Sequence, residues 1–352
     1  MSTARDPIRL GCLDDTPRGV DRALLGRALE AARLRAARAG HFRGMLDLVC
    51  VRAERSPGGG TRAVEQAYAR LARADVVAVL GPAIGDAALV ATPLAREHRV
   101  PTINFAGTER ARGEWMFHLQ IGSHEEEPSL LARQLVRDGV ERVALVFERG
   151  VIGERYATFF AAACAAEGLA LKVRSGLGPE DDPAPVVRAA LASRPEALVY
   201  LGLGLGLPRF SAALAATGFD DALACNSCGM FGWAGTGHRE ALEGWRYVDV
   251  WSEDNAELGV ARRALGLSDG DGPTGVIYAD LATLVVEGFA RAPEPTRPGV
   301  LHGLERVKAL PAALGSAGTQ LGFGTWDRAA LKGPYLVPRR WRGGRSVPWH
   351  AG

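Results

Sequence analysis

The chain has 352 residues, of which 47% are hydrophobic and 23% charged, with a mean hydropathy of -0.00. This composition is that of a globular protein with room for two domains. The 42 Lys and Arg residues against 40 Asp and Glu leave a net charge of +2, which gives no support for a nucleic-acid-binding surface. No apolar run approaches the ~20 residues that a membrane-spanning helix needs, so we expect no such segment.

Two features of the sequence bear on the compartment. The N-terminal residues lead directly into a strand-like segment, without the apolar stretch and small-residue cleavage site of a secretory signal. As it stands, the sequence therefore predicts a cytoplasmic location, while a processed sequence leaves a periplasmic or cell-surface location open. The cysteines are an odd number and widely spread, which favours reduced thiols over a disulfide framework.

In the first part of the chain, β-rich runs alternate with amphipathic stretches. The predicted strands are residues 8–13, 46–53, 76–80 and 101–105. The predicted helices are residues 22–39, a helix that Thr61 is expected to cap, and residues 86–97. Residues 22–39 are rich in helix-forming Ala, Leu and Arg, and the apolar residues after Thr61 recur at helical spacing.

The same alternation continues beyond residue 140. The predicted strands are 142–147, 169–174, 197–201, 222–226 and 245–250, with helices at 154–167, 186–193 and 208–217. Strands flanked by helices indicate parallel sheets that are covered on both faces, here in two α/β lobes. The alternation of strands and helices ends at Trp251. Beyond it we predict helices at 273–290 and 299–310 and a terminal hairpin with strands at 335–337 and 346–347.

The loops that follow the strands are the candidate ligand contacts, because ligands of open parallel sheets lie beyond the carboxyl ends of the strands. The loops are 14–16, 81–86 and 106–108 in the first lobe and 149–153, 202–206 and 227–233 in the second. They are rich in small residues, which let the backbone approach a ligand. The loop 81–86 also leads into a helix, whose free N–H groups favour a polar or anionic group.

A series of motifs follows in a fixed order along the chain. They are Gly81-Pro82 after an apolar strand, Pro93-Leu-Ala, Val100-Pro-Thr-Ile-Asn-Phe-Ala-Gly-Thr108, Val143-Ala-Leu-Val-Phe-Glu148 with Gly153, and Lys332-Gly-Pro-Tyr335. Together they resemble the type I periplasmic binding proteins. That family includes the leucine/isoleucine/valine-binding proteins of ABC importers and the cytoplasmic amide sensors. The resemblance extends over roughly residues 8–347.

The resemblance implies two Rossmann-like lobes with parallel sheets, joined by three hinge crossovers. Lobe one would hold residues 8–120 plus 252–328, and lobe two residues 121–251 plus 329–350. A small organic ligand in the cleft between the lobes would shift the equilibrium between open and closed arrangements. We therefore expect a non-catalytic protein without metal or cofactor. Its role is either that of the substrate-binding component of a branched-chain-amino-acid-type ABC transporter, with a permease as partner, or that of a cytoplasmic sensor with a regulatory protein as partner.

The resemblance also places the ligand contacts. They are Ile84, Gly85, Asp86, Ala106, Gly107, Thr108, Ile152, Leu203, Gly204, Phe231 and Trp233. Gly85 and Asp86 stand where amino-acid-binding members carry serines for the ligand carboxylate, and Ile152 stands where they often carry a tyrosine. The segment 226–229 offers no acid for a ligand ammonium. Because an unpaired buried charge costs several kcal/mol, we expect an amide, an aromatic or aliphatic acid, or an amino acid derivative rather than a standard amino acid.

Other features favour structural roles. Asp86 is expected to cap its helix, Asp14 and Asp15 to form a solvated turn, and Trp233 to line the cleft or to pack within its lobe. Cys225-x-x-Cys228 lacks the second ligand pair of a zinc site. An enzyme is the competing class, but the strand exits carry mostly Gly, Ala and Thr, which have little acid–base capacity.

Overall fold

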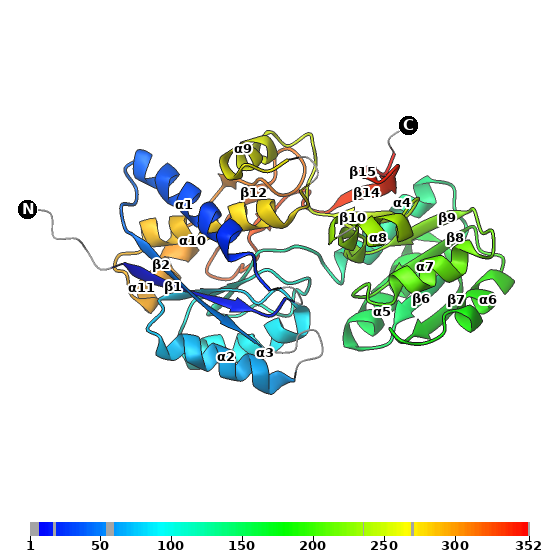
Figure 1. Cartoon of the computed structure of the whole chain (residues 1–352), viewed down its shortest axis with the longest axis horizontal. Helices are drawn as coiled ribbons and strands as arrows, with labels where there is room; N and C mark the ends of the chain where they lie inside the picture. Colours follow the sequence, from blue (N-terminus) through cyan, green and yellow to red (C-terminus); the bar gives the residue numbers. More distant parts are fainter. Residues whose placement is uncertain (1–6, 17–18, 54–59, 235, 269–270, 351–352) are drawn as a thin grey trace, which may run out of the picture. The chain divides into compact units, whose positions relative to one another are not determined.

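The computed structural model describes residues 7–16, 19–53, 60–234, 236–268 and 271–350. These divide into two compact units. Unit 1 comprises Met1–Ile121 and Trp251–Tyr335, and unit 2 comprises Gly122–Val250 and Leu336–Gly352. The chain therefore passes from one unit to the other three times, and each unit is built from segments that are distant in sequence (Figure 1).

The sheet of unit 1 has five parallel strands in the order β2-β1-β3-β4-β5. The strands are β1 (Ile8–Asp14), β2 (Leu46–Arg52), β3 (Ala78–Leu80), β4 (Thr102–Asn104) and β5 (Met116–His118). The helices are α1 (Arg22–Arg38), α2 (Thr61–Arg73), α3 (Gly85–Glu97), α9 (Ala256–Leu265), α10 (Thr274–Arg291) and α11 (Arg297–Glu305). Helices α2 and α3 cover one face of the sheet, and α1, α10 and α11 lie on the other (Figure 1).

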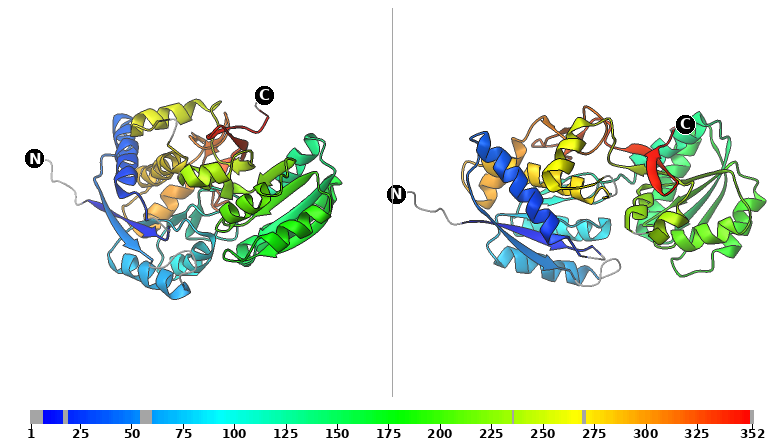
Figure 2. Two further views of the ribbon diagram at one scale, coloured as in Figure 1. Left: turned by 45° about the vertical axis from the view of Figure 1, so that its right-hand side comes forward. Right: turned by 45° about the horizontal axis from the view of Figure 1, so that its top comes forward.

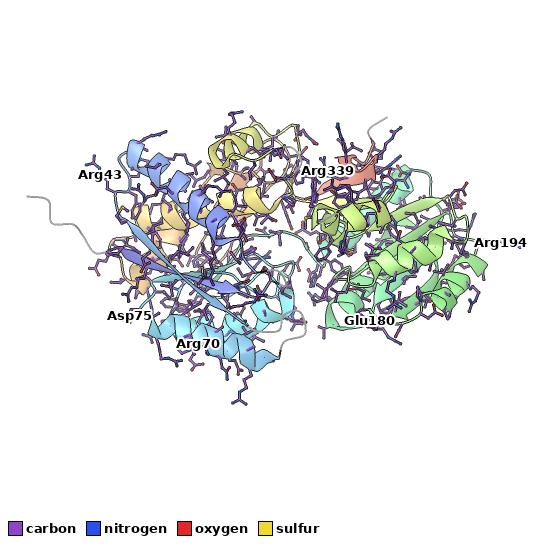
Figure 3. The ribbon with its side chains drawn as sticks, in the orientation of Figure 1. Arg43, Arg70, Asp75, Glu180, Arg194 and Arg339 are labelled. Carbon is purple, nitrogen blue, oxygen red and sulfur yellow. The ribbon has the colours of Figure 1, made fainter. Side chains whose placement is uncertain are left out.

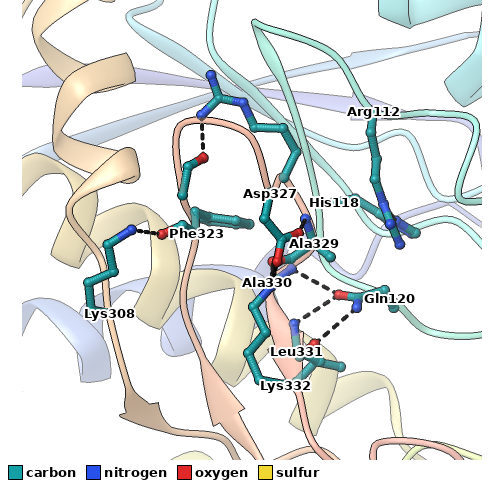
Figure 4. A network of polar contacts seen from close by, with 12 residues as sticks. Arg112, His118, Gln120, Lys308, Phe323, Asp327, Ala329, Ala330, Leu331 and Lys332 are labelled. Carbon is teal, nitrogen blue, oxygen red and sulfur yellow. Dashed lines mark hydrogen bonds and ion pairs between the residues drawn. The ribbon is translucent and has the colours of Figure 1, made fainter.

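The last part of unit 1 forms a small antiparallel sheet of β11 (Leu310–Pro311), β12 (Gln320–Leu321) and β13 (Leu331–Lys332). Residues 329–335 thus pack with unit 1, whereas the sequence analysis assigned them to lobe two. The reason is a set of hydrogen bonds to Gln120: its Oε1 accepts from the backbone N–H of Ala330 and of Leu331, both at 2.9 Å, and its Nε2 donates to the Leu331 carbonyl at 3.1 Å (Figure 4).

The sheet of unit 2 has seven strands in the order β15-β14-β10-β9-β8-β6-β7. The five strands β6 to β10 are parallel to one another. The strands are β6 (Arg142–Glu148), β7 (Ala170–Leu177), β8 (Ala197–Leu201), β9 (Ala222–Cys225), β10 (Arg246–Asp249), β14 (Val337–Arg342) and β15 (Arg345–Pro348). The helices are α4 (Glu126–Arg137), α5 (Val151–Glu167), α6 (Ala184–Ala192), α7 (Leu207–Ala215), the 3-10 helix η1 (Ser227–Ala234) and α8 (Thr236–Ala241).

Two hydrophobic clusters enclose the sheet of unit 2. Helices α4 and α5 supply residues such as Leu131 and Phe160 to one cluster, and α6 and α7 supply residues such as Val187 and Phe210 to the other. Helices therefore cover both faces, as the views in Figure 2 show. Charged side chains such as Arg70 project from the surface, whereas Arg339 is fully buried in unit 2 (Figure 3).

The predicted α/β class with parallel sheets is confirmed. The terminal hairpin is also present as β14 and β15. Its two-residue turn, Gly343 and Gly344, has positive φ at both positions, 57° and 68°, which glycine adopts without steric cost. Helices α4 and α9 and strand β5 were not predicted from the sequence, and α11 ends at Glu305, five residues before its predicted end.

Candidate functional site

In unit 1, three strand exits come together at one edge of the sheet. Strands β1, β3 and β4 are neighbours and parallel, so the residues that follow them lie side by side. The exits are Asp14–Thr16 after β1, the loop that leads from Gly81 into α3, and the segment 105–112 after β4. Six of the predicted contacts, Ile84 to Asp86 and Ala106 to Thr108, belong to the second and third exits.

Asp15 is the central polar residue of this edge. Its side chain is only 1% exposed, and its two oxygens accept hydrogen bonds of 2.8 Å from the backbone N–H groups of Ala83 and Ile84. Burial raises the pKa of Asp15 to about 6, against the lowering effect of these two bonds. Asp14 is also buried and accepts from the backbone and hydroxyl of Thr16. The expectation of a solvated turn at these two residues was therefore wrong.

Helix α3 begins without a capping side chain at its N-cap. The N-cap residue is Ile84, and Asp86, which the sequence analysis expected to cap the helix, is exposed in the first turn instead. Asp15 satisfies the donors just ahead of the helix, so it replaces a local cap. The backbone N–H groups of Gly85, Asp86 and Ala87 have no acceptor within the helix, because the first turn of any α-helix leaves its donors free.

The loop after β4 is held in place by two buried polar side chains. The amide nitrogen of Asn104 donates to the carbonyls of Ala111 and Phe117, both at 2.8 Å. His118 Nε2 donates to the Ala106 carbonyl at 2.7 Å. The Nδ1 atom of His118 accepts from Arg112 Nε at 3.1 Å, and Figure 4 shows these two side chains together. These contacts fix the backbone on both sides of the predicted ligand contacts.

Within this loop, Ala106 and Thr108 are buried and Gly107 is partly exposed. The hydroxyl of Thr108 has no hydrogen-bond partner among the residues that the structure describes. The residue is 1% exposed, but its hydroxyl oxygen is not among the fully buried polar atoms without a partner, so this oxygen keeps some contact with solvent. An unpaired hydroxyl on a rigidly held loop is a group that a ligand can satisfy.

In unit 2, the exits of β6, β8 and β9 are likewise neighbours. Glu148, at the end of β6, is 5% exposed, and its carboxylate binds the backbone of the loop after β8. It accepts from the backbone N–H of Leu203 at 2.7 Å and of Gly206 at 2.9 Å, and from the hydroxyl of Tyr200 at 2.7 Å. Glu148 therefore occupies two N–H groups just ahead of α7, as Asp15 does ahead of α3.

The remaining predicted contacts lie in different surroundings within unit 2. Phe231 is 41% exposed and lies against Gly204, where a Cβ would come within 3.0 Å of its ring. Ile152 is 7% exposed and belongs to the hydrophobic cluster beside α5. Trp233 donates to Asp249 at 3.3 Å and packs edge-on against Trp341, which favours its packing role.

Glu127 is a buried acid whose contacts the sequence analysis did not identify. Its carboxylate accepts from the backbone N–H of Ser123 and of Ser227, both at 2.6 Å, and from the Tyr156 hydroxyl at 2.9 Å. Burial raises its pKa to about 7. Nothing in the sequence around Glu127 signals a contact with a residue 100 positions away.

A cavity of about 300 Å³ lies elsewhere in unit 1, among α1, α9 and α10. Alanines form much of its wall, and its buried acid, Asp280, already accepts hydrogen bonds of 2.9 Å from the N–H groups of Ala313 and Leu314. None of the predicted contacts lines it. The candidate site is therefore the strand-exit edge and not this cavity.

The described part of the chain holds no cluster of three or more His, Cys, Asp or Glu side chains suited to a metal ion. Among the helices of that part, none is long and apolar enough to cross a membrane. The acids near the strand exits accept hydrogen bonds from loop N–H groups, so their role in the structure is to hold loops in position.

Residues 7–330 match the model of a family described as periplasmic binding protein, so the chain belongs to the periplasmic binding protein family. Comparison with curated protein sequences gives no significant match. The resemblance to the type I members that the motifs indicated is confirmed.

Solved structures share the fold. A leucine binding protein LivK from Thermotoga maritima has a TM-score of 0.77 at 15% identity, with 97% of each chain covered. A type 1 periplasmic binding protein from Bordetella pertussis has a TM-score of 0.80 at 16% identity, covering 97% of this chain and all of that one (100%). An ABC transporter substrate-binding protein from Desulfitobacterium hafniense, solved in complex with Leu, has a TM-score of 0.78 at 18% identity and covers 97% and 100%.

Proposed function

We propose that this protein binds a small organic solute without transforming it, as the substrate-binding component of an ABC importer of the branched-chain amino acid type. Family membership and the shared fold support the class. The observation that carries the proposal lies at the carboxyl ends of the neighbouring strands β3 and β4. The Thr108 hydroxyl is in the loop after β4, and the loop after β3 leads into α3, whose first N–H groups have no acceptor within the helix. A ligand-dependent change between open and closed arrangements, as in the family, is part of the proposal.

The two strand-exit acids narrow the ligand class. Asp15 stands at the start of α3 and Glu148 at the start of α7, and each already takes two backbone N–H groups. A ligand carboxylate at either helix would face a protein carboxylate, and like charges at close range repel. A neutral polar head group, above all an amide, can accept from Gly85 N–H and pair with Thr108 without that repulsion. An amide is therefore the proposed ligand head group.

The test uses matched pairs that differ only in the head group: butyramide with butyrate and benzamide with benzoate, plus leucine and isoleucine. Each is added to the purified chain in a thermal-denaturation assay, and mass spectrometry identifies any small molecule that co-purifies. A binder at a hundredfold excess over its Kd is expected to raise the melting temperature by about 5 °C. We expect a shift with an amide and none with the matching acid.

A shift with leucine or with the acids alone would refute the ligand class but keep the binding role. Chemical conversion of a bound compound, followed by NMR, would refute the non-catalytic role. The second candidate, a sensor, is separated from the importer component by its partner: pull-down with a permease supports the importer, and pull-down with a soluble regulator supports the sensor.

A further inference from the structure

Two cysteines lie directly opposite each other in the sheet of unit 1. Cys12 on β1 and Cys50 on β2 are register partners in a parallel pair of strands, so their side chains extend from the same face. Cys12 is 2% exposed, whereas Cys50 is partly exposed on β2, the edge strand of the sheet. Both thiols are free in the structure.

The spacing of this pair suits a covalent bond. Neighbouring strands lie about 4.8 Å apart, and disulfides span Cα separations of roughly 4.4–6.8 Å. The register places the two residues side by side, on adjacent strands and on the same face of the sheet. Since β2 is bonded to the sheet on one side only, it can adjust to the shorter sulfur–sulfur distance of a disulfide.

The surroundings make the two thiols unequal. The neighbouring Cys12 thiol, together with the positive charge of Arg22, lowers the pKa of Cys50 to about 7. The neighbouring Cys50 thiol, together with burial, raises the pKa of Cys12. Cys50 is thus the partly exposed thiol that reacts first, and Cys12 is the buried thiol beside it.

The other cysteines have no such arrangement. Cys164 is buried without a register partner, and burial raises its pKa to about 12. Cys225 and Cys228 lie close together in the sequence but are only 0% and 4% exposed, so neither is accessible to a reagent. The reactive pair in unit 1 is therefore distinct within the protein.

We propose that Cys12 and Cys50 form an oxidation site, at which a low-molecular-weight disulfide converts the two thiols into an intramolecular disulfide. The Cys50 thiolate attacks one sulfur of the reagent RSSR, which breaks the S–S bond, forms a mixed disulfide and releases RS⁻. Cys12 then attacks the Cys50 sulfur, its proton passes to the thiolate that leaves, and a second RSH departs. Two protein thiols are oxidised and one RSSR is reduced to two RSH.

The bond would join β1 to β2 just before the strand exit that carries Asp14 and Asp15. It closes a loop of residues 12–50, which includes helix α1. Closure of a loop of this length restricts the unfolded chain, so we expect the oxidised protein to melt about 5 °C higher than the reduced protein.

The experiment treats the reduced full chain with oxidised glutathione at pH 7, followed by intact mass measurement and non-reducing peptide mapping. The expected result is the loss of two hydrogens, a cross-linked pair of peptides that contain Cys12 and Cys50, and reversal by dithiothreitol. A stable glutathione adduct on Cys50 without the cross-link, or a cross-link between Cys225 and Cys228 alone, would overturn the proposal.

Variants test the order of the two steps. In Cys12→Ser the second thiol is missing, so the glutathione adduct on Cys50 should accumulate. In Cys164→Ser the cross-link should form as in the unchanged chain. Alkylation by iodoacetamide supplies a measurement that needs no variant: Cys50 should react at least about tenfold faster than Cys164. Equal rates would overturn the assignment of Cys50 as the reactive thiol.

Discussion

Asp15 Oδ2 accepts a hydrogen bond of 2.8 Å from the backbone N–H of Ile84, the residue that precedes helix α3. The protein therefore supplies its own carboxylate at a helix start where the family resemblance implied a ligand carboxylate. The same arrangement recurs at Glu148 with the loop before α7 and at Asp280 with Ala313 and Leu314. Asp15 and Glu148 thus fix loops at which parallel strands end, and Asp280 in the same way fixes the loop after the antiparallel strand β11.

Removal of the Asp15 carboxylate should loosen the start of α3. In Asp15→Ala the N–H groups of Ala83 and Ile84 lose their acceptor, and a buried unsatisfied donor costs about 1–3 kcal/mol. We expect a loss of unfolding free energy in that range and faster hydrogen exchange at both amides. The matched control is Asp86→Ala, which removes an exposed acid from the same helix start and should cost less than about 1 kcal/mol. Equal losses in the two variants would show that the hydrogen bonds of Asp15 contribute little.

Glu127 should make stability depend on pH near neutrality. Burial raises its pKa from 4.5 to about 7 in the folded state, so the folded protein holds this proton more tightly than the unfolded chain. The resulting stability is fully present below the unfolded pKa and is lost as the pH rises through about 7. A shift of this size corresponds to about 3 kcal/mol at most. Urea unfolding between pH 5 and pH 8 should therefore give a falling free energy.

The variant Glu127→Gln carries no titrating group at this position. Its unfolding free energy should therefore decrease less between pH 5 and pH 8 than that of the unchanged chain. Asp15 and Asp280, whose pKa values burial raises to about 6 and about 7, keep the rest. Glu126→Gln, a change at the exposed neighbour, is the control and should keep the full slope. An unchanged slope in Glu127→Gln would contradict the assignment.

The fold was predictable because its signals are local. Strands of four residues or more in a buried parallel sheet read as apolar runs, and the helices between them show their own periodicity. The short strands β3, β4 and β5 have three residues each, too few for a pattern of their own. Strands β3 and β4 were predicted only within longer apolar runs, and β5 was not predicted.

The polar contacts of the site were not predictable in the same way. Asp15 bonds to Ile84, 69 positions away, and Glu127 bonds to Ser227, 100 positions away. Such pairs depend on which strands become neighbours, and the order of strands is not written in any one segment. For this reason the sequence predicted Asp15 as a solvated turn residue and Asp86 as a helix cap. In the structure Asp15 is buried and bonded to the residues before α3, whereas Asp86 is exposed.

Thr108 should separate ligand binding from stability. Thr108→Val keeps the shape of the side chain and removes a hydroxyl that has no partner in the described part of the chain, so the melting temperature of the free protein should change by less than about 2 °C. The Kd of the amide found in the thermal assay should rise about tenfold, the value of one lost hydrogen bond. Calorimetric titration measures the second quantity.

The control is Thr102→Val. The Thr102 hydroxyl is buried and contacts the Tyr68 hydroxyl at 2.6 Å and the Val100 carbonyl at 3.0 Å. Its removal should lower stability by about 1–2 kcal/mol and leave the ligand affinity unchanged. If Thr108→Val behaved like Thr102→Val, Thr108 would be a structural turn residue and not a ligand contact.

Gly153 shows how closely unit 2 is packed behind its strand exits. A Cβ at this position would lie 1.9 Å from the carbonyl oxygen of Glu148 and 2.8 Å from its carbonyl carbon. These are backbone atoms, which cannot turn aside as a flexible side chain can. In Gly153→Ala helix α5 must move away from β6, and with it the strand end that holds the loop 202–206 through the Glu148 carboxylate.

We expect Gly153→Ala to destabilise unit 2 by about 4 kcal/mol or more, measured by urea unfolding, and to increase hydrogen exchange at Leu203 and Gly206. Gly26→Ala is the control. Gly26 lies inside helix α1, and an added Cβ would meet no described atom within 4 Å other than the neighbouring backbone of its own helix. The change should therefore stabilise unit 1 by about 0.5–1 kcal/mol through helix propensity. The two substitutions are chemically identical and differ only in what the new methyl group meets. A small effect at Gly153 would therefore mean that α5 does not approach β6 as closely as described. It would also contradict the inference that this packing holds the loop 202–206 in place through Glu148.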